Sequence, residues 1–137
     1  MPPTNDVDAA SHAASSGLKG LRVLVVEDTW LVAKAMKTAL EGMGMMVAGP
    51  TANAADAERL VAEEKPDLAV VDVNLKGEMA YDLIDWMHDR GIRVVVVSGY
   101  ALLPGTTQKA AAVLQKPFSG AELQTTLRQV MNRRTTH

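Results

Sequence analysis

Short apolar runs alternate with amphipathic segments along most of this chain, and that alternation restricts the fold more than any other feature. The expected strands are residues 21–26, 45–49, 68–71, 92–97 and 112–115. Each run is too short for a buried helix, and most are dominated by Val, Leu and Ile. Because the runs are apolar on both faces, they indicate a parallel sheet that is covered on both sides.

Five helical segments are expected between and after these strands. The apolar face of the first consists of Val32, Ala35, Met36, Ala39, Leu40 and Met43. The second and third span residues 53–64 and 80–90, and the last opens with Ser119-x-x-Glu122, the pattern of a capping box. With right-handed crossovers, these elements predict an α/β fold of the flavodoxin-like type, with strand order 2-1-3-4-5 and helices on both faces.

The length of 137 residues suggests one domain. Residues 1–18, which are rich in Ala, Ser, Pro and Asn, are expected to form a flexible leader. The folded domain is expected over residues 19–134, followed by a short tail at 135–137. Within the domain, Pro50 is expected to close the second strand.

Composition excludes several classes of protein. The chain has no cysteine, so it has neither disulfides nor thiolate metal ligands, which fits a cytoplasmic protein. A net charge of −2 provides no general attraction to nucleic acid or to anionic membranes. No apolar run approaches the ~20 residues of a membrane span, and the N-terminus lacks the basic and apolar regions of a secretory signal. We therefore expect neither a nucleic-acid nor a membrane partner.

Polar side chains follow four of the five expected strands. Glu27 and Asp28 follow the first, Asp72 the third, Ser98 the fourth, and Lys116 comes just after the fifth. Each has an ordinary structural explanation when taken alone, such as a helix cap, a turn or a solvated lysine. Ligands of open parallel sheets bind outside the carboxyl ends of the strands, so their joint placement predicts a functional site there.

The residue types at this rim suit phosphoryl transfer. Three gathered carboxylates repel one another, and a divalent cation such as Mg²⁺ (or Mn²⁺) relieves that repulsion. Asp72 can act as a carboxylate nucleophile that forms an aspartyl-phosphate. Lys116 and Ser98 can contact the oxygens of the phosphoryl group, since the protein's part in this chemistry is mostly positioning and charge stabilisation.

Four motifs resemble, in order and in context, the CheY-like receiver domain of two-component response regulators. They are VVED (25–28), VVDVN (70–74), VVVVSG (94–99) and QKPF (115–118). Each motif is weak alone, but together they place the right residues at the right strand ends. The resemblance covers about residues 21–133.

The resemblance implies a role for each matching residue of the metal site. Asp72 is implied as the phosphoacceptor, and Asp28 and Asp72 as direct ligands of Mg²⁺. Glu27 is implied to act mostly through water, and Asn74 through its backbone carbonyl. Ser98 and Lys116 are implied to contact the phosphoryl group, and the bond between Lys116 and Pro117 to be cis, as is usual in this family.

The function implied is that of a single-domain response regulator. Such a protein accepts a phosphoryl group from the phosphohistidine of a histidine kinase or phosphotransfer protein and signals through a downstream protein target or a phosphorelay. It catalyses its own phosphorylation and dephosphorylation and is not a turnover enzyme. The stand-alone type is expected because too few residues follow Arg134 for an output domain. A homodimer is possible for this family.

The sequence departs from the family at its switch region. Val113 occupies the position of the usual aromatic switch residue, so Tyr100 and Pro117 are further switch or output candidates. The segment between Ser98 and Lys116 is shortened, and Pro104 and Gly105 predict a short or irregular fourth helix. These features resemble an alphaproteobacterial receiver subgroup with a Thr-Gly-Tyr (FAT GUY) motif, and they suggest that residues 100–111 are the moving output surface.

Three other functions fit part of the pattern. A phosphatase of the haloacid dehalogenase type also uses an aspartyl-phosphate, but it needs its nucleophile on the first strand and a second Asp where this chain has Asn74. A receiver-like scaffold that is not phosphorylated needs no acidic residues, hydroxyl or lysine at the rim, so the presence of all of them argues against it. A flavin-binding module shares the fold, but the acidic loop at residues 27–30 disfavours a flavin phosphate.

Overall fold

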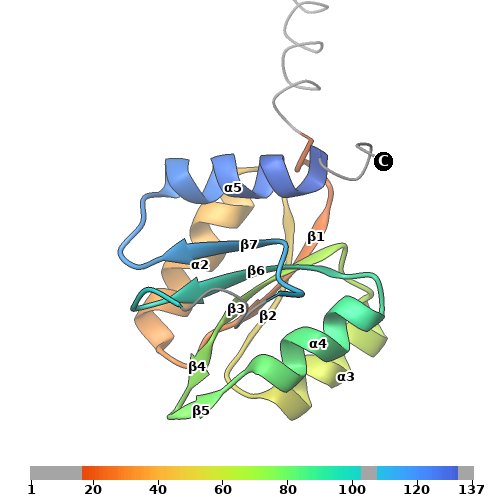
Figure 1. The fold of residues 1–137 in the computed structure, drawn as a ribbon. Coiled ribbons are helices and arrows are strands. Elements are labelled where there is room, and N and C mark those ends of the chain that lie inside the picture. Colours follow the sequence, from red (N-terminus) through yellow and green to blue (C-terminus); the bar gives the residue numbers. More distant parts are fainter. Residues whose placement is uncertain (1–16, 103–107, 133–137) are drawn as a thin grey trace, which may run out of the picture.

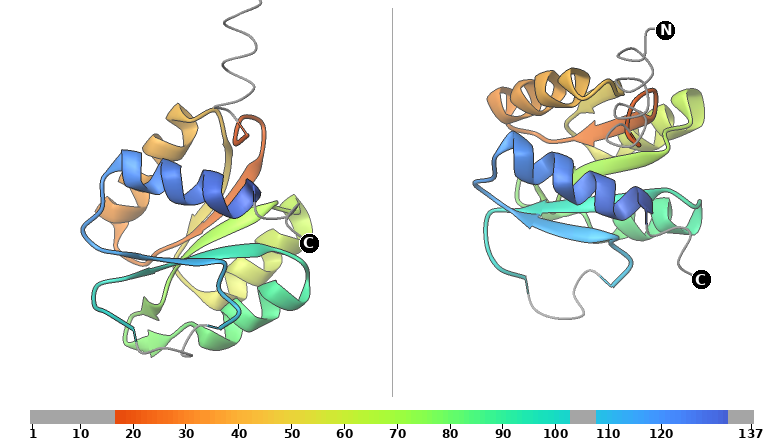
Figure 2. Two further views of the ribbon diagram at one scale, coloured as in Figure 1. Left: turned by 45° about the horizontal axis from the view of Figure 1, so that its top comes forward. Right: turned by 90° about the horizontal axis from the view of Figure 1, so that it is seen from above.

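The computed structural model describes residues 17–102 and 108–132. These residues form a five-stranded parallel sheet with helices on both faces (Figures 1 and 2). Its strands are β1 (Arg22–Val26), β2 (Met46–Thr51), β3 (Leu68–Asp72), β6 (Arg93–Ser98) and β7 (Ala112–Gln115). They lie in the order β2-β1-β3-β6-β7, and every neighbouring pair is parallel. This is the flavodoxin-like order that the sequence predicts.

Four helices in the described residues cover the sheet. Helices α2 (Trp30–Gly42) and α5 (Gly120–Asn132) lie on one face, and α3 (Ala54–Glu64) and α4 (Tyr81–Asp89) lie on the other (Figure 1). Successive strand residues point to opposite faces, so Val25 of β1 packs with α2 and α5 whereas Leu24 packs with α3 and α4. Strands buried on both faces explain the continuous apolar runs.

Local signals set the beginnings of two helices. The Asn53 side chain accepts a hydrogen bond of 2.8 Å from the Asp56 backbone N–H at the start of α3. At the start of α5, Ser119 N–H donates to Glu122 Oε1 at 2.8 Å, and Glu122 N–H donates to Ser119 Oγ at 3.0 Å. The predicted capping box is therefore confirmed.

The fourth expected helix falls within residues 101–111, of which 103–107 lie outside the described residues. The described residues on either side, 101–102 and 108–111, are not helical.

The prediction for the apolar face of α2 was partly wrong. Ala33, which was not predicted, is buried beside Met36 and Leu40, whereas Ala35 is exposed. The sheet covers only one part of the apolar stripe, and Ala35 lies on the part that faces a surface groove. The apolar residues of α2 therefore face the sheet on one side and the groove on the other.

Strand β2 does not end before Pro50, as predicted, but runs through it to Thr51. A proline is tolerated there because β2 is an edge strand, so its backbone has one side without a strand partner. The register with β1 shifts between Leu24 and Val26, which marks a local bulge. Gly49 has φ of +86°, and a Cβ there would lie 2.9 Å from the Thr51 nitrogen, so a glycine is needed at this bend.

The N-terminal part of the chain enters the core before β1. Residues 17–20 form a turn, and Leu18 is 1% exposed within the cluster under α2 and α5. The rest of the expected leader, residues 1–16, and the expected tail at 135–137 lie outside the described residues. Across residues 17–102 and 108–132, no helix has the length and apolar character needed to cross a membrane.

A small antiparallel hairpin follows β3, where the sequence indicated only a turn around Gly77. It consists of β4 (Asn74–Leu75) and β5 (Glu78–Met79). Lys76 and Gly77, which connect the two strands, have φ of 54° and 87°. Positive φ at both central residues is what a type I′ hairpin turn requires. Leu75 is buried and attaches the hairpin to the rest of the fold.

Candidate functional site

Three carboxylates meet at the carboxyl ends of β1 and β3. Val26 pairs with Val71 in the parallel register, so the residues that follow, Glu27 and Asp72, come level with each other. Ligand oxygens of Glu27, Asp28 and Asp72 all lie within 4.8 Å of one another. Glu27 is 2% exposed and Asp72 is 6% exposed, so their mutual repulsion is poorly screened by solvent.

Lys116 places an ammonium group between two of these carboxylates. The β6–β7 register pairs Ser98 with Gln115, so Lys116 follows at the same rim of the sheet, and its N–H donates to the Ser98 carbonyl at 2.7 Å. Its Nζ donates to Asp72 Oδ2 at 2.9 Å and lies 3.2 Å from Glu27 Oε1. Burial of the ammonium opposes its charge, but the hydrogen bond to Asp72 and the attraction of both carboxylates outweigh this and raise the pKa of Lys116.

Glu27 is left with an incompletely satisfied carboxylate. Its Oε2 accepts a hydrogen bond of 3.0 Å from the Thr29 N–H. Its Oε1 is buried and, among the described residues, has no hydrogen-bond partner of good geometry, even though Lys116 Nζ is close. Burial, together with the charge of Asp72, raises the pKa of Glu27 against the opposing effects of Thr29 and Lys116.

These residues fit a hard divalent cation. Three carboxylates face one ammonium group, so the cluster keeps a net negative charge. The buried Glu27 Oε1 without a good donor is a further oxygen that a cation, directly or through water, would satisfy. Carboxylate oxygens at this spacing are the ligand type that Mg²⁺ and Mn²⁺ take in proteins.

The β4–β5 hairpin orients two of the carboxylates. Asn74 N–H donates to Asp72 Oδ1 at 2.9 Å, and Lys76 N–H donates to Asp28 Oδ2 at 2.8 Å. The Asn74 side chain in turn accepts from Gly77 N–H at 2.8 Å, which stabilises the turn. Sequence reasoning missed the part played by Lys76, although the Asn-x-x-Gly spacing was a signal for such a turn.

Ser98 is fully buried at the end of β6, and its hydroxyl forms hydrogen bonds with the backbone of Tyr100 rather than with Asp72. Ser98 Oγ accepts from the Tyr100 N–H at 3.1 Å and donates to the Tyr100 carbonyl. The Tyr100 hydroxyl donates to the Met79 sulfur at 3.7 Å, which connects this loop to the hairpin. Sequence reasoning missed Met79, because no motif of the chain marks it.

An open cleft lies over Asp72, and most of the predicted site residues line it. Its lining consists of Asp28, Thr29, Asp72, Asn74, Lys76, Gly77, Gly99, Tyr100 and Lys116. Two of the switch candidates lie elsewhere. Val113 is 47% exposed on β7, and Pro117, whose bond with Lys116 is cis, lines a different groove.

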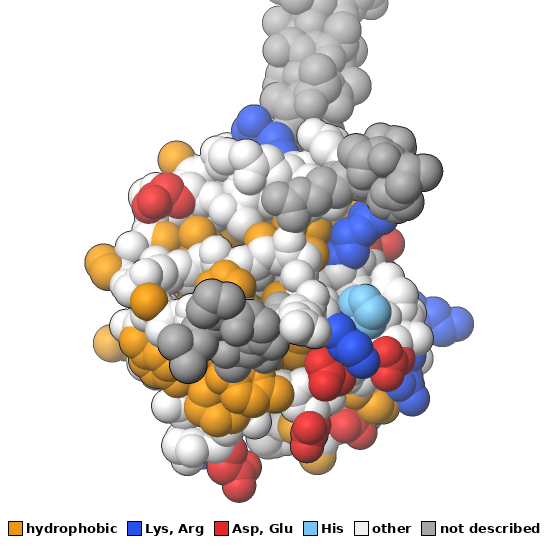
Figure 3. Space-filling view, viewed as in Figure 1, with side chains coloured by type: hydrophobic (Ala, Val, Ile, Leu, Met, Phe, Trp, Pro, Cys, Tyr) orange, Lys and Arg blue, Asp and Glu red, His pale blue; other side chains and the backbone are white. Residues whose placement is uncertain are grey.

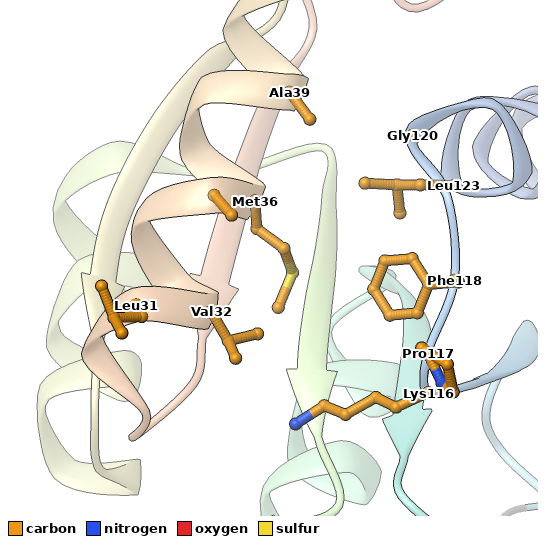
Figure 4. A pocket seen from close by; sticks show the side chains of 10 residues that line it. Leu31, Val32, Met36, Ala39, Lys116, Pro117, Phe118, Gly120 and Leu123 are labelled. Carbon is orange, nitrogen blue, oxygen red and sulfur yellow. The ribbon is translucent and has the colours of Figure 1, made fainter.

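That second groove is apolar and lies between α2 and the start of α5 (Figure 4). It is lined by Leu31, Val32, Ala35, Met36, Ala39, Lys116, Pro117, Phe118, Gly120 and Leu123. Phe118 and Leu123 face Met36 and Val32 across it, and the side chain of Lys116 runs along its lower end (Figure 4). Because Lys116 lines both spaces, the groove adjoins the Asp72 cleft.

Comparison with known proteins points to one family. The sequence model of the response regulator receiver domain matches residues 23–128. The chain is similar to the KDP operon transcriptional regulatory protein KdpE of Escherichia coli (strain K12), with 34% identity over 128 residues that cover 81% of this chain and 51% of that protein. It is also similar to the transcriptional regulatory protein DesR of Bacillus subtilis (strain 168), with 25% identity over 118 residues that cover 82% of this chain and 59% of that protein. The chain thus spans only about half to three fifths of these relatives.

Solved structures show the same fold. The receiver domain of the response regulator PhyR from Erythrobacter litoralis has a TM-score of 0.75 and 26% identity, over 83% of this chain and 92% of that one. The response regulator PhyR from Brucella abortus has a TM-score of 0.79 and 23% identity, over 93% of this chain and 54% of that one.

Proposed function

The chain belongs to the family of response regulator receiver domains, and we propose that it accepts a phosphoryl group on Asp72 in a reaction that needs a divalent cation. One observation carries this proposal. In the cleft that Asp28 also lines, Asp72 is hydrogen-bonded to Lys116, and the buried Glu27 carboxylate lies beside them. An acceptor, a counter-charge and a cation site are the parts that phosphoryl transfer requires.

In the proposed reaction, an oxygen of Asp72 attacks phosphorus and the bond to the leaving group breaks. Asn74 N–H holds Oδ1, and Lys116 holds Oδ2 until its ammonium group moves to an incoming phosphoryl oxygen. The Ser98 hydroxyl exchanges its bond to the Tyr100 carbonyl for one to another phosphoryl oxygen.

Asp28 and Asp72 would hold Mg²⁺ or Mn²⁺ directly, with Glu27 acting through water and Asn74 through its backbone carbonyl. The ion supplies positive charge that neutralises the phosphoryl oxygens. Receiver domains are phosphoacceptors and not turnover enzymes. We propose that the chain catalyses both the gain and the loss of its own phosphoryl group.

We propose that the phosphodonor is the phosphohistidine of a histidine kinase or phosphotransfer protein. The output would be contact with a downstream protein or relay of the phosphoryl group, in the cytoplasm. The Ser98-Gly99-Tyr100 sequence at the end of β6 supports a link to the Thr-Gly-Tyr subgroup, and Tyr100 rather than Val113 is the proposed switch residue because it lines the cleft.

The apolar groove supports a docking place for the phosphodonor protein, because it adjoins the cleft through Lys116. Leu31 lines the groove and is 71% exposed. The donor for this test is a phosphorylated histidine phosphotransfer protein that phosphorylates the wild type. We expect Leu31→Lys to slow phosphotransfer from this donor by about tenfold or more, because one apolar anchor is lost. Phosphorylation by acetyl phosphate should be unchanged. Met46→Lys, at an exposed site on β2, is the matched control, and equal slowing with both donors would contradict docking here.

Divalent cations are expected to stabilise the fold in a pH-dependent way. Mg²⁺ should raise the melting temperature, since it binds the folded chain and not the unfolded one. Because the pKa of Glu27 is raised, its carboxyl takes up a proton at a higher pH than an exposed glutamate, so Mg²⁺ affinity should fall as pH drops through that raised pKa. Glu27→Gln should flatten this pH dependence.

The measurement is a Mg²⁺ titration followed by the fluorescence of Trp30, which lines a pocket together with Glu27 and Asp28. A Trp86→Phe background removes the other tryptophan signal. An affinity that does not change with pH in the wild type would contradict a role for Glu27 in cation binding.

Incubation with acetyl phosphate, with and without Mg²⁺, tests the proposed function by intact mass. The expected result is a Mg²⁺-dependent gain of one phosphoryl group. No gain despite normal Mg²⁺ binding would restrict the proposal to protein phosphodonors. No gain and no Mg²⁺ binding would favour a scaffold, and repeated turnover of small phosphate esters would favour a phosphatase.

A further inference from the structure

A contact joins the two sides of the Asp72 cleft, and the proposed phosphoryl chemistry does not use it. The Tyr100 hydroxyl donates to the Met79 sulfur at 3.7 Å. Tyr100 lies in the loop after β6 and Met79 lies on β5, so the contact runs from that loop to the hairpin. Tyr100 is 45% exposed and Met79 is 41% exposed, so core packing does not account for the position of either side chain. Hydrophobic side chains gather on the surface around this hairpin and the start of α4 (Figure 3).

On the hairpin side, Met79 is connected to Asp72 through Asn74. Met79 is the partner of Asn74 in the β4–β5 register, and the N–H of Asn74 donates to Asp72 Oδ1. Each hairpin strand has only two residues, and a hairpin of that size is marginal without outside contacts. Its position therefore depends on attachments such as buried Leu75, the Lys76 N–H on the metal-site carboxylate, and Met79 itself.

On the other side, the same tyrosine holds the hydroxyl of Ser98. The Tyr100 backbone both donates to and accepts from Ser98 Oγ. The Met79 contact thus fixes a residue against which Ser98 is held, while the hairpin fixes Asp72. In the unphosphorylated chain, this single weak contact therefore connects Asp72, through the hairpin, to Tyr100 and Ser98.

We propose that Met79 is a positioning residue whose contact with Tyr100, the Met79–Tyr100 clasp, prolongs the lifetime of the phosphoryl group on Asp72. This inference rests on the proposed function of Asp72. The group is lost when water attacks phosphorus and the phosphorus–oxygen bond to Asp72 breaks, which releases the carboxylate and inorganic phosphate. The clasp restrains the hairpin and the loop that border the path of that water, so its loss speeds the attack.

The test is the rate of phosphoryl loss after acetyl phosphate is removed, followed by intact mass in Mg²⁺. Met79→Leu keeps most of the side-chain volume but removes the sulfur acceptor, and Tyr100→Phe removes the donor. Each is expected to hydrolyse about threefold to tenfold faster than the wild type, the range for one lost hydrogen bond of modest strength. Because both variants break the same contact, the double variant should be no faster than either single one.

Met46→Leu is the matched control, because Met46 is also exposed but lies on edge strand β2. Its phosphoryl group should be lost at the wild-type rate. Unchanged rates in Met79→Leu and Tyr100→Phe, or rates that multiply in the double variant, would overturn the clasp.

A second readout separates the clasp from the proposed function. In unphosphorylated protein labelled with ¹³C at its methionine methyl groups, Tyr100→Phe should shift the Met79 signal and leave the Met46 signal in place. An unmoved Met79 signal overturns the contact. A wild-type chain that gains no phosphoryl group overturns the proposed function, and the claim about lifetime with it, whatever this spectrum shows.

Discussion

Asp72→Asn is expected to abolish the phosphoryl gain and to raise the stability of the metal-free fold. The amide is not a nucleophile towards phosphorus, so no aspartyl-phosphate forms. Asn keeps the shape of Asp and an oxygen for the Asn74 N–H, while it removes one of three crowded carboxylates. Lys116 then pairs with Glu27 alone. The expected gain is about 1 to 2 kcal/mol in the free energy of unfolding, which is smaller than the full cost of a buried charge because the lost Lys116 contact offsets part of it.

Thermal unfolding without divalent cations measures this gain. Asp85→Asn on the exposed side of α4 is the matched control and should change stability by less than about 0.5 kcal/mol. The pKa of Glu27 should also fall towards its ordinary value in Asp72→Asn, because the charge of Asp72 is one of the causes that raise it. A less stable Asp72→Asn variant would show that the contact with Lys116 outweighs the repulsion among the carboxylates.

Lys116→Met is expected to change cation binding and phosphorylation in opposite directions. The ammonium group occupies Asp72 Oδ2 and lies against Glu27 Oε1, so it competes electrostatically with a divalent ion for the same oxygens. Its removal should tighten Mg²⁺ binding. Phosphorylation by acetyl phosphate should nevertheless slow by about a hundredfold or more, the typical loss when one positioned donor to a developing charge is removed.

Mg²⁺ titration and the rate of phosphoryl gain at saturating Mg²⁺ separate the two effects. Lys109→Met, which removes an exposed lysine paired with Asp89, is the control and should change neither. Weaker Mg²⁺ binding in Lys116→Met would mean that Lys116 organises the cation site, and unchanged phosphorylation would remove it from the chemistry.

Lys116 also affects stability at high pH. Its pKa is raised in the folded chain, so the stability from its contacts is present below the ordinary lysine value and is lost as pH rises through the raised value.

The sheet could be predicted from the sequence because its signal is redundant. Strands such as β3 and β6 are apolar on both faces, which leaves few arrangements other than a covered parallel sheet. The choice between Ala33 and Ala35 on α2 could not be predicted, because the apolar stripe is wider than the surface of the sheet that it meets. The continuation of β2 through Pro50 could not be predicted either. A proline is tolerated there because β2 is an edge strand, and the residues around Pro50 alone do not reveal that position.

The gathering of site residues could be predicted for the same reason, since parallel strands bring their carboxyl ends to one rim. The finer contacts could not. The Ser98 hydroxyl binds the backbone of Tyr100, and the Met79–Tyr100 clasp depends on a hairpin whose strands are only two residues long. Such contacts are set by the shape of loops, and their residue types carry no periodic signal.

The site of phosphoryl attachment is the most direct test of the central claim. After incubation with acetyl phosphate and Mg²⁺, borohydride reduces an aspartyl-phosphate to homoserine, and peptide mass spectrometry locates that residue. Homoserine at position 72, dependent on Mg²⁺ and on acetyl phosphate, is the predicted result. Homoserine at another aspartate, or the reduced alcohol of a glutamate such as Glu27, with position 72 still aspartate, would contradict the assignment of Asp72 as the phosphoacceptor.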